Sequence, residues 1–200
     1  MRIRQYIVTY NNPFQLNEGL ASLFSSISAE EAELLEVFVI NNHSNFELHP
    51  EFTSRVTVLH NVLRPDFSTG HLARNWNQAL INGFENLVHP ACDLVITNQD
   101  DTRFSPNYIN RVIDLHTKFD LTQFGWGDNF ISYTPTAVRV VGLWDERFCN
   151  IAYHEADYQL RARIYNGNKS SINDHEQGRV LNPTDIIVRH PPHNEDKRTA

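Results

Sequence analysis

Residues 94–101 have the sequence Leu94-Val95-Ile96-Thr97-Asn98-Gln99-Asp100-Asp101. The first four residues form a continuous run without polar alternation, which predicts a strand that is buried on both faces of a sheet. Four polar side chains end the run, and the last two are adjacent carboxylates. Because ligands of parallel α/β sheets bind beyond the carboxyl ends of the strands, these residues predict a functional site at the end of this strand.

The chain around this strand alternates predicted strands with amphipathic helices. Three more strands are predicted from short β-rich runs: 6–10, 37–40 and 56–59. Three helices are predicted from apolar residues at helical spacing: 16–27 with Asn17 as its cap, 72–84, and 105–119 with Ser105 as N-cap and Pro106 as first residue. This β-α-β-β-α-β-α order predicts an α/β fold with a mixed, largely parallel sheet flanked by helices.

The second half of the chain is less regular. Two strands and a helix are predicted there: 130–133, 137–141 and 153–165. A last apolar run at 186–188 leads to His190. The sequence contains no internal repeat and no linker that would divide it, so we expect a single domain.

Two hundred residues with 40% hydrophobic and 20% charged side chains are typical of one compact domain and exclude a wholly disordered chain. We expect that domain to cover residues 1–193, followed by a polar tail over 194–200. Two cysteines exclude a disulfide framework, and a net charge of -7 provides no basic surface for nucleic acid. The apolar runs are too short to span a bilayer and no signal peptide is recognised, so we expect a cytoplasmic protein.

Asp100 and Asp101 carry the strongest chemical signal of the sequence. Two adjacent carboxylates at the end of a strand form a set of hard oxygen ligands that suits Mg²⁺ or Mn²⁺, with phosphate oxygens completing the coordination. The alternative is that one carboxylate caps the following turn and the other is solvated. Their position, where the sheet predicts a ligand, favours the metal-binding interpretation.

Six segments, in order along the chain, resemble the GT-A glycosyltransferases, particularly family 2. The strand that ends in Asp100-Asp101, with the short stretch to a proline and a helix, is similar to the metal-binding DxD region of that family. The other five segments are Ile7-Val8-Thr9-Tyr10-Asn11, Val39-Ile40-Asn41-Asn42-His43-Ser44, Gly70-His71-Leu72-Ala73-Arg74-Asn75-Trp76-Asn77, Val141-Gly142-Leu143-Trp144-Asp145-Glu146-Arg147-Phe148 and His154-Glu155-Ala156-Asp157-Tyr158-Gln159-Leu160-Arg161. The resemblance spans roughly residues 5–190.

This resemblance implies a Rossmann-like GT-A domain in which residues 1–101 bind a nucleotide sugar and residues 102–193 bind the acceptor. It implies a metal-dependent, inverting glycosyltransferase, hexosyltransferase-like, that moves a sugar from a nucleoside diphosphate sugar to a hydroxyl of a glycan or other acceptor. UDP is favoured because Asn41-Asn42 resembles uridine-binding positions. An acidic chain that binds an anionic donor would use the metal as its positive charge. Attachment to further domains of a longer chain is compatible with this picture.

The resemblance also implies roles for particular residues. Asp101 and Asp100 would hold the metal, with His190 as a third ligand that favours Mn²⁺ over Mg²⁺. The donor-binding residues that it implies are Thr9, Tyr10, Asn11, Asn42, Arg74, Asn75, Asn98 and Asp100. Glu155 would act as general base on the acceptor hydroxyl, and Asp157 is the second candidate for that role.

Two positions depart from the family pattern. Asn98 replaces the first acid of the metal motif, so metal binding would depend on the two aspartates that follow. The usual Glu-Asp pair is His154-Glu155, which places a side chain one methylene longer at the position of the base. Asp157 lies roughly 200° away from Glu155 on a helix and can instead pair with Arg161.

Two other functions fit parts of this pattern. A nucleotidyltransferase has a related α/β core and a metal, but the sequence has no strong glycine-rich phosphate loop of that type near its first strand. A non-catalytic domain that binds a sugar or a nucleotide sugar is compatible with Asn98 and His154, which stand at positions that are usually acidic. Three outcomes distinguish these functions. A nucleotidyltransferase turns over nucleoside triphosphates, a glycosyltransferase turns over nucleotide sugars, and a binding domain binds without turnover.

Overall fold

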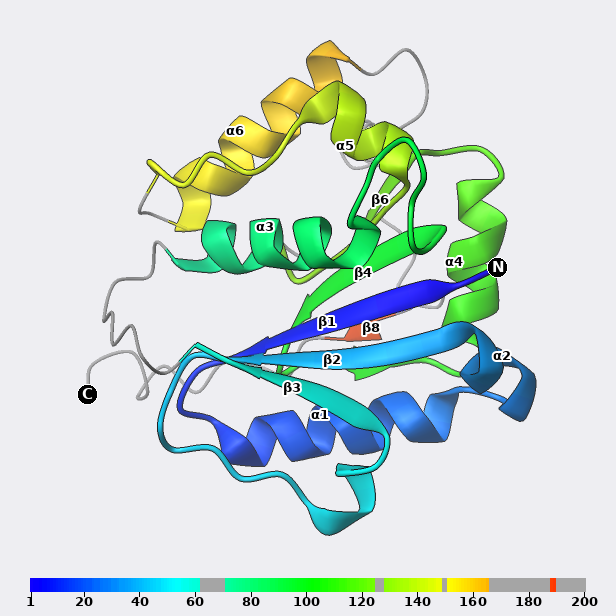
Figure 1. Ribbon diagram of the computed structural model, residues 1–200, viewed down its shortest axis with the longest axis vertical. Coiled ribbons are helices and arrows are strands. Elements are labelled where there is room, and N and C mark those ends of the chain that lie inside the picture. Colours follow the sequence, from blue (N-terminus) through cyan, green and yellow to red (C-terminus); the bar gives the residue numbers. More distant parts are fainter. Residues whose placement is uncertain (62–70, 125–127, 149–150, 166–187, 190–200) are drawn as a thin grey trace.

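The computed structural model describes residues 1–61, 71–124, 128–148, 151–165 and 188–189. A six-stranded sheet in the order β3-β2-β1-β4-β7-β6 forms its centre (Figure 1). Its strands are β1 (Ile3–Thr9), β2 (Leu35–Asn41), β3 (Val56–His60), β4 (Leu94–Gln99), β6 (Leu121–Phe124) and β7 (Phe130–Tyr133). The first four strands in that order are parallel, whereas β7 pairs antiparallel with both β4 and β6. The predicted mixed, largely parallel sheet is therefore confirmed.

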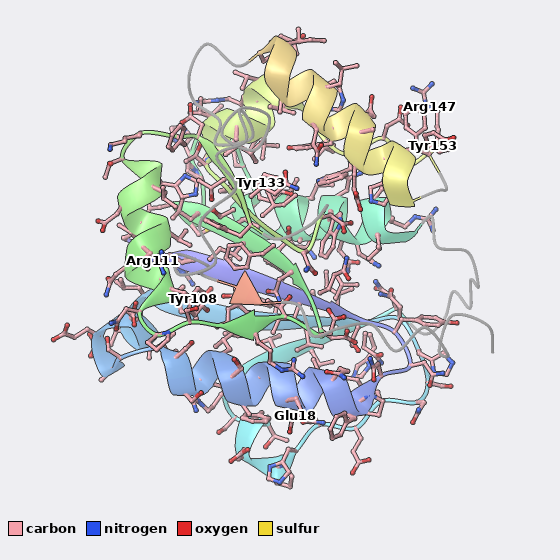
Figure 2. All side chains as sticks on the ribbon, turned by 180° about the vertical axis from the view of Figure 1, so that it is seen from behind. Glu18, Tyr108, Arg111, Tyr133, Arg147 and Tyr153 are labelled. Atoms are coloured by element: carbon pink, nitrogen blue, oxygen red, sulfur yellow. The ribbon has the colours of Figure 1, made fainter. Side chains whose placement is uncertain are left out.

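Helices cover both faces of the sheet (Figure 1). On one face lie α1 (Pro13–Ser26) and α4 (Tyr108–His116), and on the other lie α3 (His71–Phe84), α5 (Pro135–Val141) and α6 (Ile151–Ile164). The short helices α2 (Ala29–Leu34) and η1 (Pro50–Phe52) flank β2 and β3 in the sequence. Each face has its own core: Figure 2 shows Tyr108 on the side of α4 and Tyr133 on the side of α6. None of the helices in the described part of the chain is long and apolar enough to cross a membrane.

β4 is buried on both faces, as its apolar run predicts. Leu94 and Ile96 pack into the core beside α1 and α4, while Val95 packs on the opposite side beside α3. β1 pairs in parallel with both β2 and β4, and Thr9 lies beside Asn41 in this register. The polar residues that end the three strands therefore meet at one edge of the sheet.

A second sheet of two strands joins parts of the chain that are far apart in the sequence. β5 (Arg103–Phe104) pairs antiparallel with β8 (Val188–Arg189), and Arg103 is the partner of Arg189. β8 therefore lies beside Arg103, which is two residues after Asp101 in the sequence. His190 follows β8 but lies outside the described residues, so its role as a metal ligand stays a prediction.

The predicted starts of two helices are wrong. α1 begins at Pro13, and the Asn17 side chain lies inside the helix, where it donates to the Pro13 carbonyl rather than capping the first turn. α4 begins at Tyr108 instead of Pro106, because Asn107 has a left-handed φ of 59° that interrupts the backbone after Ser105. In both cases the apolar face of the helix is predicted correctly, and only the first residue of the helix is wrong.

Residues 137–141 form part of helix α5 rather than the predicted strand. The Thr134 side chain accepts a hydrogen bond from a backbone N–H of the first turn, and Pro135 begins the helix with a suitable φ. These two residues outweigh the β-branched valines that favour a strand. The capping box between Ser28 and Glu31 likewise establishes α2, a helix that the sequence analysis did not predict.

Candidate functional site

Asp100 and Asp101 lie in a tight turn that begins where β4 ends. The backbone N–H of Thr102 donates to the Gln99 carbonyl at 3.3 Å and closes the turn. Gly19 of α1 lies against it: a Cβ atom at this position would lie 2.5 Å from the Asp100 carbonyl oxygen. A glycine in α1 therefore allows the helix to approach the turn that carries both carboxylates.

Asp100 is held by the end of the neighbouring strand. The Thr9 hydroxyl donates to its Oδ2 atom at 2.6 Å. Burial raises the pKa of the Asp100 carboxyl to about 7; Thr9 and Arg103 oppose this rise, and the charge of Asp101 adds to it. A buried carboxyl beside another negative charge is stabilised by a proton or by a cation, and adjacent carboxylates are the ligands that Mn²⁺ and Mg²⁺ prefer. These residues therefore fit the metal that the resemblance implies.

The donor-binding residues predicted in the first half gather where β1 and β2 end. Thr9 ends β1, and its carbonyl accepts a hydrogen bond from the Asn42 backbone N–H at 3.1 Å. Asn11 has a left-handed φ of 51° in the turn that follows. The Tyr10 ring contacts the His43 ring edge-on and is 46% exposed, so one of its faces is available to a planar ligand.

Side-chain amides connect this region to α3. The Asn61 side chain, which follows β3, donates to Asn42 Oδ1 at 3.2 Å and to Gln78 Oε1 at 2.8 Å. The Oδ1 atom of Asn75 lies 3.5 Å from the same nitrogen, and Asn75 is only 3% exposed. Asn75 therefore contributes to the position of Asn42 through Asn61, as the buried member of a partly exposed amide cluster.

Arg74 lies one position earlier on α3 and is more exposed. Its Nε atom donates to Glu146 Oε2 at 3.3 Å, and the two side chains are 44% and 41% exposed. An ion pair this exposed contributes little to stability. The structure therefore gives Arg74 a protein partner that a phosphate group can replace at low cost.

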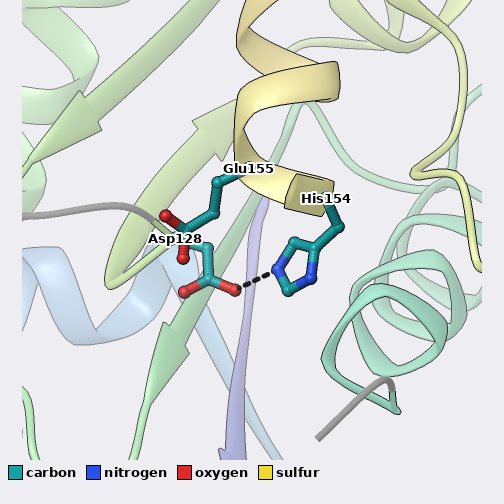
Figure 3. A group of neighbouring side chains, drawn as sticks. All are labelled: Asp128, His154 and Glu155. Atoms are coloured by element: carbon teal, nitrogen blue, oxygen red, sulfur yellow. Dashed lines mark hydrogen bonds and ion pairs between the residues drawn. The ribbon is translucent and has the colours of Figure 1, made fainter. Parts of the chain in front are cut away.

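A second group of polar side chains connects β4 with α6. Asp128 precedes β7 and is 1% exposed. Trp76 Nε1 donates to its Oδ2 atom at 2.7 Å, Gln99 Nε2 to Oδ1 at 2.8 Å, and His154 Nε2 lies 3.1 Å from Oδ2. Figure 3 shows the Glu155 carboxyl group beside that of Asp128. Ligand-type atoms of Asp128, His154 and Glu155 all lie within 4.8 Å of one another.

The environment of Glu155 suits the base that the sequence predicts there. Burial raises the pKa of Glu155 to about 7, the negative charge of Asp128 adds to the rise, and the charge of His154 opposes it. A carboxyl group with a pKa near neutral pH is an effective general base under those conditions. Gln99 joins this group to the metal turn, because it bonds to Asp128 and immediately precedes Asp100.

Two of the predicted site residues form hydrogen bonds or ion pairs with other protein side chains. Asn98 is 1% exposed, and its Oδ1 atom accepts a hydrogen bond of 2.8 Å from Gln5, which in turn accepts one of 2.6 Å from the Tyr108 hydroxyl. The structure thus gives Asn98 partners in the core, and its contact with the donor stays a prediction. Asp157 forms an ion pair with Arg161 at 2.8 Å, which confirms the pairing predicted as the alternative to a catalytic role.

The roles of Gln99 and Asp128 were not predicted from the sequence, although Gln99 belongs to the polar group that ends β4. Side chains alternate along a strand, so Asn98 shares a face with Ile96, whereas Gln99 shares the opposite face with Val95. Applied to the end of β4, this alternation would have identified Gln99 as the residue directed to α6. Asp128 carries no comparable signal, because its burial depends on partners from three separate segments of the chain.

No family model and no curated protein matches this chain. Its structure is similar to that of TarS 1-349 from S. aureus, with a TM-score of 0.60 and 13% identity over 85% of this chain and 57% of that one. It is also similar to the mannosyltransferase PcManGT from Pyrobaculum calidifontis in complex with GDP-Man and Mn²⁺, with a TM-score of 0.63 and 13% identity over 97% and 58% of the two chains. A complex of TarS 1-349 with UDP-GlcNAc matches with a TM-score of 0.54 and 11% identity over 80% and 54%.

The chain thus spans somewhat more than half the length of these proteins. The sheet order, the flanking helices and the similarity to both proteins show that it has the GT-A glycosyltransferase fold. The fold that the resemblance implied is therefore confirmed.

Proposed function

We propose that this protein transfers a sugar from a nucleoside diphosphate sugar to a hydroxyl acceptor with inversion at the anomeric carbon. The observation that carries the proposal is a connected edge of the GT-A sheet. The turn of Asp100 and Asp101 is linked to Asp128 through the Gln99 side chain, and the carboxyl oxygens of Asp128 and Glu155 lie within 4.8 Å of one another. The edge therefore combines a pair of metal-binding carboxylates with a carboxyl group suited to accept a proton.

Asp101 and Asp100 would hold a divalent cation, and His190 is the expected third ligand. Mn²⁺ is favoured because imidazole binds it better than Mg²⁺. When bound there, the cation supplies positive charge to the diphosphate, which gathers negative charge as it leaves. Support for Mn²⁺ comes from PcManGT, whose structure contains GDP-Man together with this ion.

Glu155 would take the proton of the acceptor hydroxyl as the hydroxyl oxygen forms a bond to the anomeric carbon. In the same step the bond from that carbon to the phosphate oxygen breaks, and the diphosphate leaves with the electron pair. Attack from the side opposite the leaving group inverts the configuration. The Glu155 side chain is partly exposed, so an acceptor can reach it, and its pKa of about 7 suits this proton transfer.

The donor would lie over the ends of β1 and β2 and the start of α3. The exposed face of Tyr10 offers a stacking surface for a nucleobase, and the amide of Asn42 offers hydrogen bonds to the base or ribose. Thr9 and Asn11 shape the turn beneath, and Arg74 can exchange Glu146 for a phosphate oxygen. We favour UDP as the nucleotide because of Asn42, and structures with UDP-GlcNAc and GDP-Man define the two donors to compare first.

Thermal unfolding with and without Mn²⁺ tests the proposal. UDP-GlcNAc, GDP-Man and dTDP-glucose are compared. We expect one of these nucleotide sugars to raise Tm by roughly 5 °C when Mn²⁺ is present and to leave Tm unchanged when Mn²⁺ is absent. Asp101→Ala should abolish the Mn²⁺-dependent part, whereas Glu155→Gln should keep donor binding and lose transfer. The proposal is wrong if none of the sugar nucleotides changes Tm, or if the protein turns over nucleoside triphosphates instead.

A further inference from the structure

Asp128 is a buried carboxylate that the proposed reaction leaves without a role. It lies just before β7, on a segment separate from both β4 and α6. Its oxygens accept hydrogen bonds from Trp76, Gln99 and His154. An indole nitrogen can only donate, and an ionised carboxylate can only accept, so these partners favour the ionised form of Asp128 and fix its orientation.

Asp128 reaches Glu155 in two ways. Their carboxyl oxygens belong to a group of ligand-type atoms that all lie within 4.8 Å of one another, and the negative charge of Asp128 raises the pKa of Glu155. Figure 3 shows these groups side by side near the start of α6. Two carboxylates this close repel each other when both are ionised, so one proton on the pair stabilises it.

We propose that Asp128 is a positioning residue for Glu155, and that the two carboxyl groups act as a pair that holds one proton between them. This inference rests on the role of Glu155 as general base proposed above. Because three donors stabilise the negative charge of Asp128, the proton of the pair resides on Glu155. The pair must lose this proton to solvent before Glu155 can act as base. Ionised Glu155 then takes the proton of the acceptor hydroxyl, and the negative charge of Asp128 stabilises the protonated Glu155 that results.

The other charged groups around Glu155 in the described residues are engaged elsewhere or with Asp128. His154, its neighbour on α6, directs Nε2 to Asp128. Arg161, further along α6, bonds to Asp157 and to the Val141 carbonyl. The fixed charge that acts against ionisation of Glu155 is therefore that of Asp128.

The spacing of Asp128, His154 and Glu155 is also compatible with a bound cation. Both Asp128 oxygens, however, already accept hydrogen bonds from side-chain N–H groups, which a cation would have to displace. The hydrogen bonds from Trp76 and Gln99 to Asp128 therefore favour the proton-sharing pair over a cation site.

Asp128→Asn removes the charge and keeps the shape of the side chain. The asparagine Oδ1 atom can still accept from Trp76 and His154, while the Gln99 amide can turn to offer Oε1 to the new Nδ2 group. We therefore expect a folded variant in which the acidic limb of kcat against pH moves down by at least one pH unit, plateau kcat falls roughly tenfold, and the donor KM is unchanged. An equal loss of kcat at every pH, with the limb unmoved, would indicate a merely structural role and overturn the proposal.

A carboxyl titration tests the pair without any turnover. Protein labelled with ¹³C at Glu and Asp carboxyl groups is titrated by NMR after treatment with EDTA, and Glu155→Gln assigns the Glu155 signal. We expect a Glu155 midpoint near pH 7, a parallel response of the Asp128 signal, and a lower midpoint in Asp128→Asn. Asp157→Asn, on the same helix, should leave the midpoint unchanged.

A Glu155 midpoint in the ordinary glutamate range, or an Asp128 signal that does not respond, overturns the proposal. So does a midpoint that changes when Zn²⁺ or Mn²⁺ is added to a variant lacking Asp101, because the three side chains would then form a cation site. If the carboxyl groups are coupled as expected but no sugar is transferred, the proposed function fails while the pair stands.

Discussion

The Thr9 hydroxyl at the end of β1 donates a hydrogen bond of 2.6 Å to Oδ2 of Asp100, just beyond the end of β4. This bond joins two strands at the point where their polar residues leave the sheet. It couples the turn with the exposed Tyr10 ring to the turn with the two carboxylates. The nucleotide-binding and metal-binding parts of the proposed site therefore share one rigid support.

Thr9→Val should weaken Mn²⁺ binding about tenfold or more while the protein stays folded. The change removes a donor that stabilises the ionised form of Asp100, and a hydrogen bond to a charged group contributes about 1.5–3 kcal/mol. Isothermal titration calorimetry with Mn²⁺ in the presence of UDP measures the effect. Thr9→Ser, which keeps the hydroxyl, is the control and should bind Mn²⁺ as the unmodified protein does. Equal affinity in the valine and serine variants would show that the bond does not support the metal turn.

Gly19→Ala should disturb the same turn from the side of α1. The added Cβ atom would lie 2.5 Å from the Asp100 carbonyl, so helix or turn must shift, at a cost of about 1–3 kcal/mol in the free energy of unfolding. We expect weaker Mn²⁺ binding as well. Gly83→Ala is a matched control, since its Cβ would lie 2.4 Å from a Val95 methyl group in the middle of β4. It should lower stability in urea and leave the Mn²⁺ affinity of the folded protein unchanged.

Asn98→Asp, which introduces the acid usual for the family, should destabilise the protein and add no metal affinity. The Asn98 Nδ2 group donates to the Gln99 carbonyl at 2.8 Å, and a carboxylate would place an oxygen against that carbonyl in a buried position. We expect a loss of about 2 kcal/mol or more in urea unfolding. Asn82→Asp on the exposed side of α3 should change stability little. Tighter Mn²⁺ binding in Asn98→Asp would refute this placement.

Transfer should fall about tenfold for each pH unit below pH 7, because Glu155 is then protonated. The measurement is kcat against pH.

Glu155 also affects the stability of the fold. Folding raises the pKa of Glu155 from 4.5 to about 7, so the native state binds this proton more tightly than the unfolded state, and the stability associated with it is lost as pH rises through 7. Glu155→Gln should therefore gain more stability at pH 8 than at pH 5, as measured by urea unfolding. A gain independent of pH would contradict the raised pKa.

Asp157→Asn should distinguish the role of Asp157 from that of Glu155, the other acid of α6. Its carboxylate pairs with Arg161 four residues along the helix, and both side chains are about a quarter exposed. We expect a loss of about 0.3–0.5 kcal/mol in stability and less than a threefold change in kcat, against a loss of roughly a hundredfold in Glu155→Gln. A steady-state comparison of the two variants at pH 8 checks this. Similar losses in both would return Asp157 to the catalytic machinery.

The parts of the fold that follow from local physics were predictable. β4 is identified by its unbroken apolar run, and the adjacent carboxylates after it lie at the predicted edge of the sheet. The helix at 137–141 was mispredicted because Thr134 and Pro135, just outside that range, determine its conformation more strongly than its own valines. Short-range preferences thus fail where a neighbouring cap competes with them.

The site was predictable only where one residue carries its own chemical signal. Asp101 and Glu155 were found because an acid at the end of a strand, or at the start of a helix within a recognised pattern, is informative by itself. Asp128 was not, since its importance arises from the indole of Trp76, the amide of Gln99 and the ring of His154. Contacts between segments so distant in the chain leave no periodic trace in the sequence.

The pairing of β5 with β8 has a consequence for the order of folding. All four parallel strands lie within the first half of the chain, whereas the ladder beside Asp101 needs β8, which is synthesised only at residues 188–189. Such a ladder forms late. During synthesis, the GT-A sheet would therefore be in place well before the second strand arrives beside the metal turn, and a newly made chain would acquire its core first and its affinity for Mn²⁺ last.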